Sequence, residues 1–191
     1  PSLSEPSPDY NGLTFAETFG DLAFTLYSHA VSLRDLGCTQ SPMNAWITLN
    51  GVETLPLRME RHVENAQKVA GFLQQHPSVE WVSYAGLSSS PYYQLAQKYL
   101  QGKAGSVFTF GIRGGYESGL RLLEKVELFS HVSNIGDSRS LILHPASTTH
   151  RQLSDEQRLT AGAGPEVIRL SVGIESAEDL IADLEQALEG L

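Results

Sequence analysis

The stretch Glu166-Val-Ile-Arg-Leu-Ser-Val-Gly-Ile-Glu175 alternates in the manner of a β-strand. Ile168 and Leu170 share one face and Val167 and Arg169 share the other, because side chains alternate along a strand. One of the positions expected to face inward therefore carries an arginine, whose guanidinium keeps its charge and needs an anion opposite it. That anion is either a structural Asp or Glu or the carboxylate of a small substrate. The strand by itself favours the structural alternative.

Helices and short strands are predicted on the amino-terminal side of this strand. Apolar residues at helical spacing predict helices over residues 15–36, 42–52, 59–76, 92–100 and 117–126. Short apolar runs predict strands over residues 79–84, 105–112, 131–134 and 141–146. Pro56 is expected to kink or interrupt the long helical stretch. A polar loop is predicted over 147–164, and Ser176-Ala-Glu-Asp179 is interpreted as a capping box that opens a final helix. The pattern predicts an α+β layered fold.

Composition excludes several classes of function. The 191 residues carry a net charge of −9 with only 13 Lys and Arg, so no basic surface for nucleic acid is indicated. No apolar run approaches the roughly 18 residues of a membrane span. The single cysteine, Cys38, fits a reducing cytoplasm, and we expect a small buried side chain there rather than a nucleophile.

The proline-rich opening, Pro1–Gly12, is interpreted as the middle of a longer polypeptide.

Two polar loops are candidate binding elements. Asn134-Ile-Gly-Asp-Ser-Arg-Ser-Leu141 could present backbone N–H groups and an amide to a carboxylate beside an arginine. Turn formation is the better explanation of such a loop taken alone, but its place between two strands expected to neighbour the Arg169 strand favours the binding role. His144-Pro-Ala-Ser-Thr-Thr-His150 is rich in hydroxyl and imidazole groups. Its two histidines lack the cysteines and carboxylates of a zinc site, so we predict no metal site. The sequence also lacks G-x-G-x-x-G, Walker and G-x-S-x-G motifs.

Four segments together resemble one enzyme family. Leu57–Ala66, Asn134–Asp137, His144–His150 and Val167–Glu175 occur in an order and at separations similar to the carboxy-terminal part of the O-acetylhomoserine sulfhydrylases. These enzymes form a group within the pyridoxal-phosphate-dependent Cys/Met metabolism family. The resemblance covers essentially the whole chain. It implies the small carboxy-terminal domain of a fold-type I enzyme, with a short, mostly antiparallel sheet, helices on one face, and preceding long helices that pack on a cofactor domain.

The resemblance also implies residue roles and a domain organisation. Arg169 would bind the substrate α-carboxylate, with Asn134 and the backbone of Ile135 contributing to the same pocket and Thr149 lying beside it. Residues 1–60 would be the tail of the cofactor domain with a connecting helix, and residues 61–191 the carboxy-terminal α+β domain. We predict no catalytic and no cofactor-binding residue within the chain.

The lysines mark the largest departure from the family. The family binds pyridoxal 5'-phosphate as a Schiff base on a lysine within a Ser/Thr-rich motif, and none of the lysines here has that context; they are Lys68, Lys98, Lys103 and Lys125. We therefore expect the chain alone to be inactive and the cofactor to be held mainly by an amino-terminal partner domain.

The complete enzyme would convert O-acetyl-L-homoserine and sulfide to L-homocysteine and acetate, a step of methionine biosynthesis, as a cytoplasmic homo-oligomer. The alternatives are cystathionine γ-synthase activity, methionine γ-lyase activity, or a non-catalytic truncated subunit.

Overall fold

Strand β5 (Val167–Ser171) lies at the centre of a five-stranded sheet in the computed structural model, which describes residues 1–191. The strand order is β1-β2-β5-β4-β3, and the other strands are β1 (Val79–Ser83), β2 (Val107–Ile112), β3 (Ser130–His131) and β4 (Leu141–Leu143). Only β3 and β4 pair in parallel; every other neighbouring pair is antiparallel. The prediction of an α+β fold with a short, mostly antiparallel sheet is confirmed.

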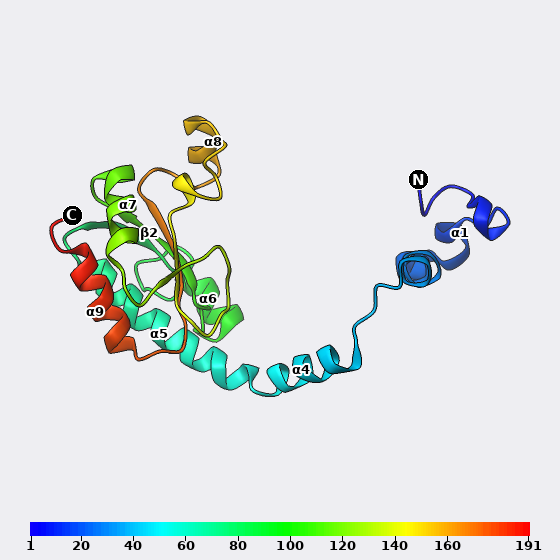
Figure 1. Ribbon diagram of the computed structural model, residues 1–191, viewed down its shortest axis with the longest axis horizontal. Helices are drawn as coiled ribbons and strands as arrows, with labels where there is room; N and C mark the ends of the chain where they lie inside the picture. The colour runs from blue at the N-terminus through cyan, green and yellow to red at the C-terminus, as the bar shows by residue number, and fades with distance from the viewer. The chain divides into compact units, whose positions relative to one another are not determined.

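Three helices, α5 (Leu55–Gln75), α7 (Gly115–Lys125) and α9 (Ala177–Leu188), cover one face of the sheet (Figure 1). Their apolar stripes meet the strand residues that point toward them, and the fully buried members include Leu73, Phe110, Leu122, Ile168, Leu170, Leu180 and Leu184. This burial removes most apolar side chains of the domain from water, which is the main force that holds the layers together.

Arg169 points to the opposite face of the sheet. Its cross-strand neighbours are Thr109 on β2 and Leu143 on β4. Val167 and Ser171, which share this face, are buried, whereas Arg169 is half-buried. The alternation predicted for the strand is therefore confirmed. The guanidinium nevertheless lies near the surface, because a long arginine side chain buries its stem and extends its charged end toward solvent.

Asp183 on α9 fixes the connection between α7 and β3. Its carboxylate accepts hydrogen bonds from the backbone N–H groups of Glu127, Leu128 and Phe129, at 2.8, 2.9 and 3.2 Å. Asp183 is buried, so its carboxylate oxygens have little access to water, and these three bonds supply the partners that they need. One side chain thereby anchors a whole loop to the helical layer.

Several predicted elements differ from the structure. The segment 147–164 is not all loop, because it contains α8 (Asp155–Thr160), which begins with a capping box formed by Ser154 and Gln157. At α9, Ser176 caps the backbone N–H of Asp179, but the reciprocal bond of a capping box is not formed. An aspartate at that position has a shorter reach than the Glu or Gln of the full motif.

The strands around the two polar loops are shorter than predicted. β3 ends at His131, and β4 ends at Leu143, after which Pro145–Ser147 forms the 3₁₀ turn η4. Proline has no N–H to donate to a neighbouring strand, so the ladder stops before it. Helix α6 (Tyr93–Leu100) agrees with the predicted helix over 92–100.

The chain divides into two compact units, Pro1–Glu53 and Thr54–Leu191. The division falls earlier than the predicted boundary after residue 60, and it coincides with the end of helix α4 (Pro42–Glu53). Pro56 lies in the first turn of α5, so the predicted interruption of the long helical stretch is confirmed. The interpretation of the first unit as the end of a cofactor domain stays a prediction.

The first unit is more broken than its sequence predicts. The helix expected over 15–36 is split into α1 (Phe15–Phe19), the 3₁₀ turn η2 (Gly20–Leu22), α2 (Ala23–Tyr27), the π-helical turn η3 (Ser28–Leu33) and α3 (Arg34–Leu36), preceded by η1 (Pro8–Tyr10). Gly20, at φ 51°, ends α1 in a conformation outside the right-handed helical region. Cys38 is exposed, so the expectation of a buried side chain there is wrong. No helix of the chain has the length and apolar character needed to cross a bilayer.

Candidate functional site

Arg169 and the 134–140 loop come together although they lie far apart in the sequence. The Nη2 of Arg169 donates a hydrogen bond of 3.3 Å to the backbone carbonyl of Asn134. Both partners are accessible: Arg169 is half-buried and Asn134 is exposed. The structure therefore places two of the predicted site residues side by side, on the face of the sheet opposite α5, α7 and α9.

The acidic groups of this region already have other partners. Asp137 forms an ion pair with Arg139 at 3.2 Å, and the hydrogen bonds from the Arg139 side chain and backbone hold the pKa of the Asp137 carboxyl below its usual value. Glu175 accepts two hydrogen bonds from Ser140. None of the ion pairs in the structure includes Arg169. The structural alternative, in which a protein carboxylate neutralises this arginine, is not observed.

The predicted backbone donor, Ile135, is directed toward its neighbour. Its N–H donates a hydrogen bond of 2.9 Å to the side-chain Oδ1 of Asn134. An incoming carboxylate oxygen would thus replace the Asn134 amide oxygen as acceptor, and the freed amide group could turn toward the ligand. The Ile135 side chain itself is 60% exposed, which is consistent with a contribution through the backbone.

The 134–140 loop is fastened to the end of β5 at several points. The N–H of Gly136 donates to the hydroxyl of Ser171 at 3.0 Å, and the N–H of Ile174 donates to the carbonyl of Ser138 at 2.9 Å. Ser140 completes the connection through Glu175 and the N–H of Gly173. Several directed hydrogen bonds at separate points fix the position of a loop better than one contact does.

Thr149 is exposed, and its hydroxyl lies 2.9 Å from Nδ1 of His150. No hydrogen bond joins it to Arg169 or Asn134, so its place beside the carboxylate pocket stays a prediction. His144 is buried, with Nδ1 3.0 Å from the Ser147 hydroxyl and Nε2 2.9 Å from the carbonyl of Pro165. Burial lowers the pKa of His144, against a smaller opposing effect of that carbonyl. This histidine organises the turn that leads to Thr149.

Two positioning residues were not found from the sequence. His62 and Asn65 of α5 are buried; Nδ1 of His62 lies 2.6 Å from the carbonyl of Val172, and the Asn65 amide donates to the carbonyls of Gly173 and Glu175 at 3.0 and 2.8 Å. They hold the segment that follows β5 against the helix. Their position on the apolar stripe of α5 was the available signal, since buried polar side chains require partners.

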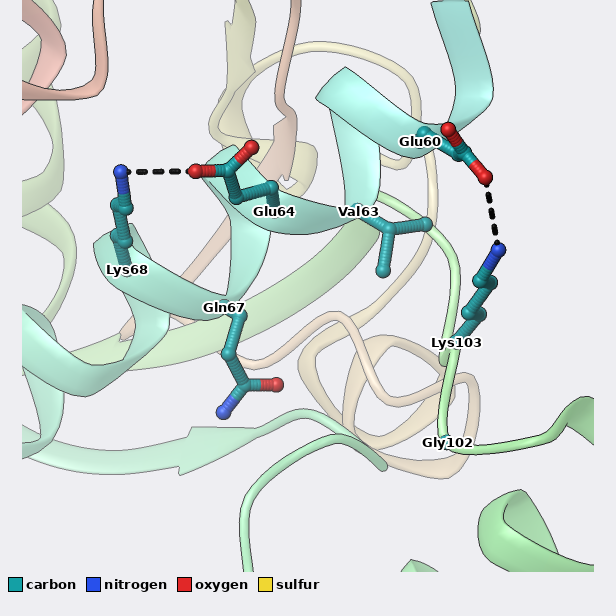
Figure 2. Close-up of a pocket in the computed structure, with 7 residues that line it drawn as sticks. All are labelled: Glu60, Val63, Glu64, Gln67, Lys68, Gly102 and Lys103. Atoms are coloured by element: carbon teal, nitrogen blue, oxygen red, sulfur yellow. Dashed lines mark hydrogen bonds and ion pairs between the residues drawn. The ribbon is translucent and has the colours of Figure 1, made fainter. Parts of the chain in front are cut away.

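The four lysines are bound to partners other than the residues around Arg169. Lys68 pairs with Glu64 at 3.0 Å and Lys103 pairs with Glu60 at 3.1 Å, as Figure 2 shows along the groove beside α5. Lys125 donates to the carbonyl of Glu189 at 2.6 Å, and Lys98 lies over the ring of Tyr99. The groove of Figure 2 contains no predicted site residue.

Comparison with known proteins decides the family. The sequence profile of the Cys/Met metabolism PLP-dependent enzymes matches residues 13–189, nearly the whole chain. The chain belongs to this family. Membership confirms the resemblance that the four motifs carry, including the Arg169 strand and the 134–140 loop, both of which lie inside the matched region.

Individual members of the Cys/Met metabolism family are closely similar to the chain. It is 51% identical to O-acetyl-L-homoserine sulfhydrylase 1 of Thermus thermophilus and 49% identical to O-acetyl-L-homoserine sulfhydrylase of Leptospira meyeri, over 98% and 100% of its length. A crystal structure of an O-acetylhomoserine (thiol)-lyase from Campylobacter jejuni, which contains a pyridoxyl-lysine-phosphate group, matches 99% of the chain with a TM-score of 0.87 and 44% identity. The chain spans about 45% of the length of each of these relatives.

Proposed function

We propose that this chain supplies the substrate-carboxylate site of an enzyme that converts O-acetyl-L-homoserine and sulfide to L-homocysteine and acetate. The observation that carries the proposal is the half-buried guanidinium of Arg169, which meets the Asn134 loop and has no protein carboxylate as partner. The two relatives named as O-acetyl-L-homoserine sulfhydrylases support the choice of substrate.

The role of the chain's own residues is to bind and orient. The Arg169 guanidinium can donate two parallel hydrogen bonds to the two oxygens of an α-carboxylate, a geometry that fixes direction as well as distance. Asn134 and the N–H of Ile135 would hold the same group from the loop side. Fixing the carboxylate directs the rest of the amino acid into the remainder of the active site, and such orientation lowers a reaction barrier by several kcal/mol.

The chain by itself does not fit the anchoring of pyridoxal phosphate. Its four lysines are bound by carboxylates, a carbonyl and an aromatic ring, and none joins the Arg169 site. The family's cofactor supplies an electron sink for amino-acid chemistry. We infer that the cofactor is held mainly by an amino-terminal domain that lies outside these 191 residues.

The exposed apolar side chains of helix α4 are a candidate interface for this amino-terminal domain. The helix has no buried residue, and its large apolar side chains are more than half exposed; they are Met43, Trp46, Ile47, Leu49 and Val52. An apolar surface of this kind is typical of an interface. We propose that the cofactor domain packs on it and that the complete enzyme is a cytoplasmic homo-oligomer.

Product analysis of the full-length protein tests the activity. With O-acetyl-L-homoserine and sulfide we expect homocysteine and acetate in equal amounts, measured by chromatography and mass spectrometry. Cystathionine formed preferentially when cysteine replaces sulfide would point instead to a cystathionine γ-synthase. Methanethiol released from methionine would indicate a γ-lyase. No turnover with any of these substrates would leave the non-catalytic alternative and overturn the proposal.

Treatment of the isolated 191-residue chain with pyridoxal phosphate and borohydride tests whether any of its lysines forms a Schiff base with the cofactor. We expect only weak labelling, distributed over the four lysines, because each is exposed and each already has a carboxylate, a carbonyl or an aromatic ring as partner. Peptide mass spectrometry locates the label, and the full-length protein serves as the positive control. Stoichiometric labelling of a single lysine in the isolated chain would contradict the expectation.

A further inference from the structure

We propose that Glu175 is a positioning residue for the carboxylate site: through Ser140 it holds the 134–140 loop where Asn134 meets Arg169. This inference rests on the proposed function, since it concerns the same site. No hydrogen bond or ion pair joins Glu175 to Arg169, and its effect is transmitted by the loop. It follows the Arg169 strand, at the carboxy-terminal end of the stretch Glu166–Glu175.

The Glu175 carboxylate binds Ser140 with both oxygens. Its Oε1 accepts from the backbone N–H of Ser140 at 2.6 Å, and its Oε2 accepts from the Ser140 hydroxyl at 2.9 Å. The hydroxyl oxygen in turn accepts from the N–H of Gly173 at 2.7 Å. Ser140 is fully buried. Its donors are therefore matched by the two acceptor oxygens of a carboxylate, which a glutamine amide could not provide together.

The backbone of the 134–140 loop also packs closely against residues 173–175, which follow β5. A side chain at Gly173 would collide with the carbonyl oxygen of Ser138 and with Arg139, so only a glycine allows the loop to approach this closely. The N–H of Ile174 donates to that same carbonyl at 2.9 Å. The loop and the segment after β5 therefore touch along their backbones, and Glu175 joins them at one end.

The Glu175 end of this connection is itself held in place. The Asn65 amide donates to the backbone carbonyl of Glu175 at 2.8 Å and to that of Gly173 at 3.0 Å. Asn65 belongs to α5 and is fully buried. The connection therefore runs from the helical layer through Glu175 and Ser140 to the loop that carries Asn134. Supporting hydrogen bonds of this kind determine how accurately a binding group is placed.

The test compares two probes that differ only in the carboxylate. L-homoserine contains the α-carboxylate, and 3-aminopropan-1-ol is the same amine without it. Calorimetric titration of the full-length holoenzyme measures the Kd of each probe for wild type, Glu175→Gln and Ser140→Ala. We expect both variants to bind L-homoserine roughly tenfold more weakly, the effect of losing a charged hydrogen bond, while the Kd of 3-aminopropan-1-ol stays unchanged. KM for O-acetyl-L-homoserine should rise with little change in kcat.

A double-mutant cycle identifies the pathway. The combination of Glu175→Gln and Ser140→Ala should cost no more than either change alone, because both remove the same connection. Glu178→Gln is the matched control, since Glu178 is an exposed glutamate in the first turn of α9 and should leave both Kd values unchanged. Hydrogen exchange of the backbone amide of residue 140 should accelerate in the proteins that carry Glu175→Gln and keep its wild-type rate in the Glu178→Gln control.

Two outcomes separate this inference from the proposed function. If Arg169→Lys weakens the binding of L-homoserine but not that of 3-aminopropan-1-ol, and Glu175→Gln has no such selective effect, the carboxylate site stands and the role of Glu175 is overturned. If Arg169→Lys also fails to distinguish the two probes, the proposed function itself is wrong. Equal weakening of both probes by Glu175→Gln would show a general structural role and would likewise overturn the inference.

Discussion

Replacing Arg169 with alanine in the full-length protein is expected to lower kcat/KM for O-acetyl-L-homoserine by roughly 100-fold or more, about 3 kcal/mol of lost transition-state binding. The guanidinium would donate charge-assisted bonds to both carboxylate oxygens, and alanine removes them without a substitute. Steady-state kinetics at varied O-acetyl-L-homoserine and saturating sulfide measures the effect. KM for sulfide should stay close to the wild-type value, because sulfide has no carboxylate to bind.

Arg169→Lys is the informative companion of the alanine variant. Lysine keeps the positive charge but presents a point charge rather than a planar pair of donors, so activity should fall between wild type and alanine. Arg139→Ala serves as the matched control, because Arg139 is an exposed arginine of the same loop whose ion pair is with Asp137. Unchanged kinetics in Arg169→Ala would remove this residue from the substrate site.

Asp183→Ala is expected to lower the free energy of unfolding of the chain by about 3 kcal/mol. The change removes the acceptor of three backbone N–H groups, of which that of Phe129 belongs to a buried residue and those of Glu127 and Leu128 belong to exposed residues. Urea unfolding followed by circular dichroism measures the loss. Asp183→Asn, which keeps one acceptor oxygen, should lose less.

Glu185→Ala on the same helix is the control for this prediction. Glu185 is exposed, so its removal should change the stability by no more than about 0.5 kcal/mol. A loss for Asp183→Ala as small as that of the control would show that the three hydrogen bonds do not stabilise the domain. In the full-length protein Asp183→Ala should lower the melting temperature with little change in KM, because no hydrogen bond joins Asp183 to Arg169 or to the 134–140 loop.

The sequence predicted the regular elements well where local signals were strong. The strand alternation around Arg169, the apolar stripe of α5 and the interruption at Pro56 were all recognised, because each depends on neighbours close in the chain. It failed where a short element depends on an isolated signal. Helix α8 was missed although Ser154 and Gln157 form a capping box, since the surrounding segment is polar and has little apolar periodicity.

The residues of the candidate site also fall into two groups, those predicted from the sequence and those found only in the structure. Arg169, Asn134 and Ile135 came from motifs and family resemblance. The positioning residues Asn65, Ser140 and Glu175 did not, because each binds a group far away in the sequence. Thr149 illustrates the converse case: it belongs to a recognised motif, yet the structure gives it only a neighbour, His150, as partner.

The sequence by itself determined the family, the central strand and the charge that this strand carries, because periodicity and motif order are properties of the chain alone. Only the tertiary structure decided what the charge faces. In the folded chain the Asn134 loop meets Arg169, while Asp137 forms an ion pair with Arg139 and Glu175 accepts hydrogen bonds from Ser140. The guanidinium of Arg169 therefore has no carboxylate of this chain as partner. Which charged groups pair depends on the distances between them in the folded chain and on which other groups lie as near. The order of residues in the sequence does not contain these distances.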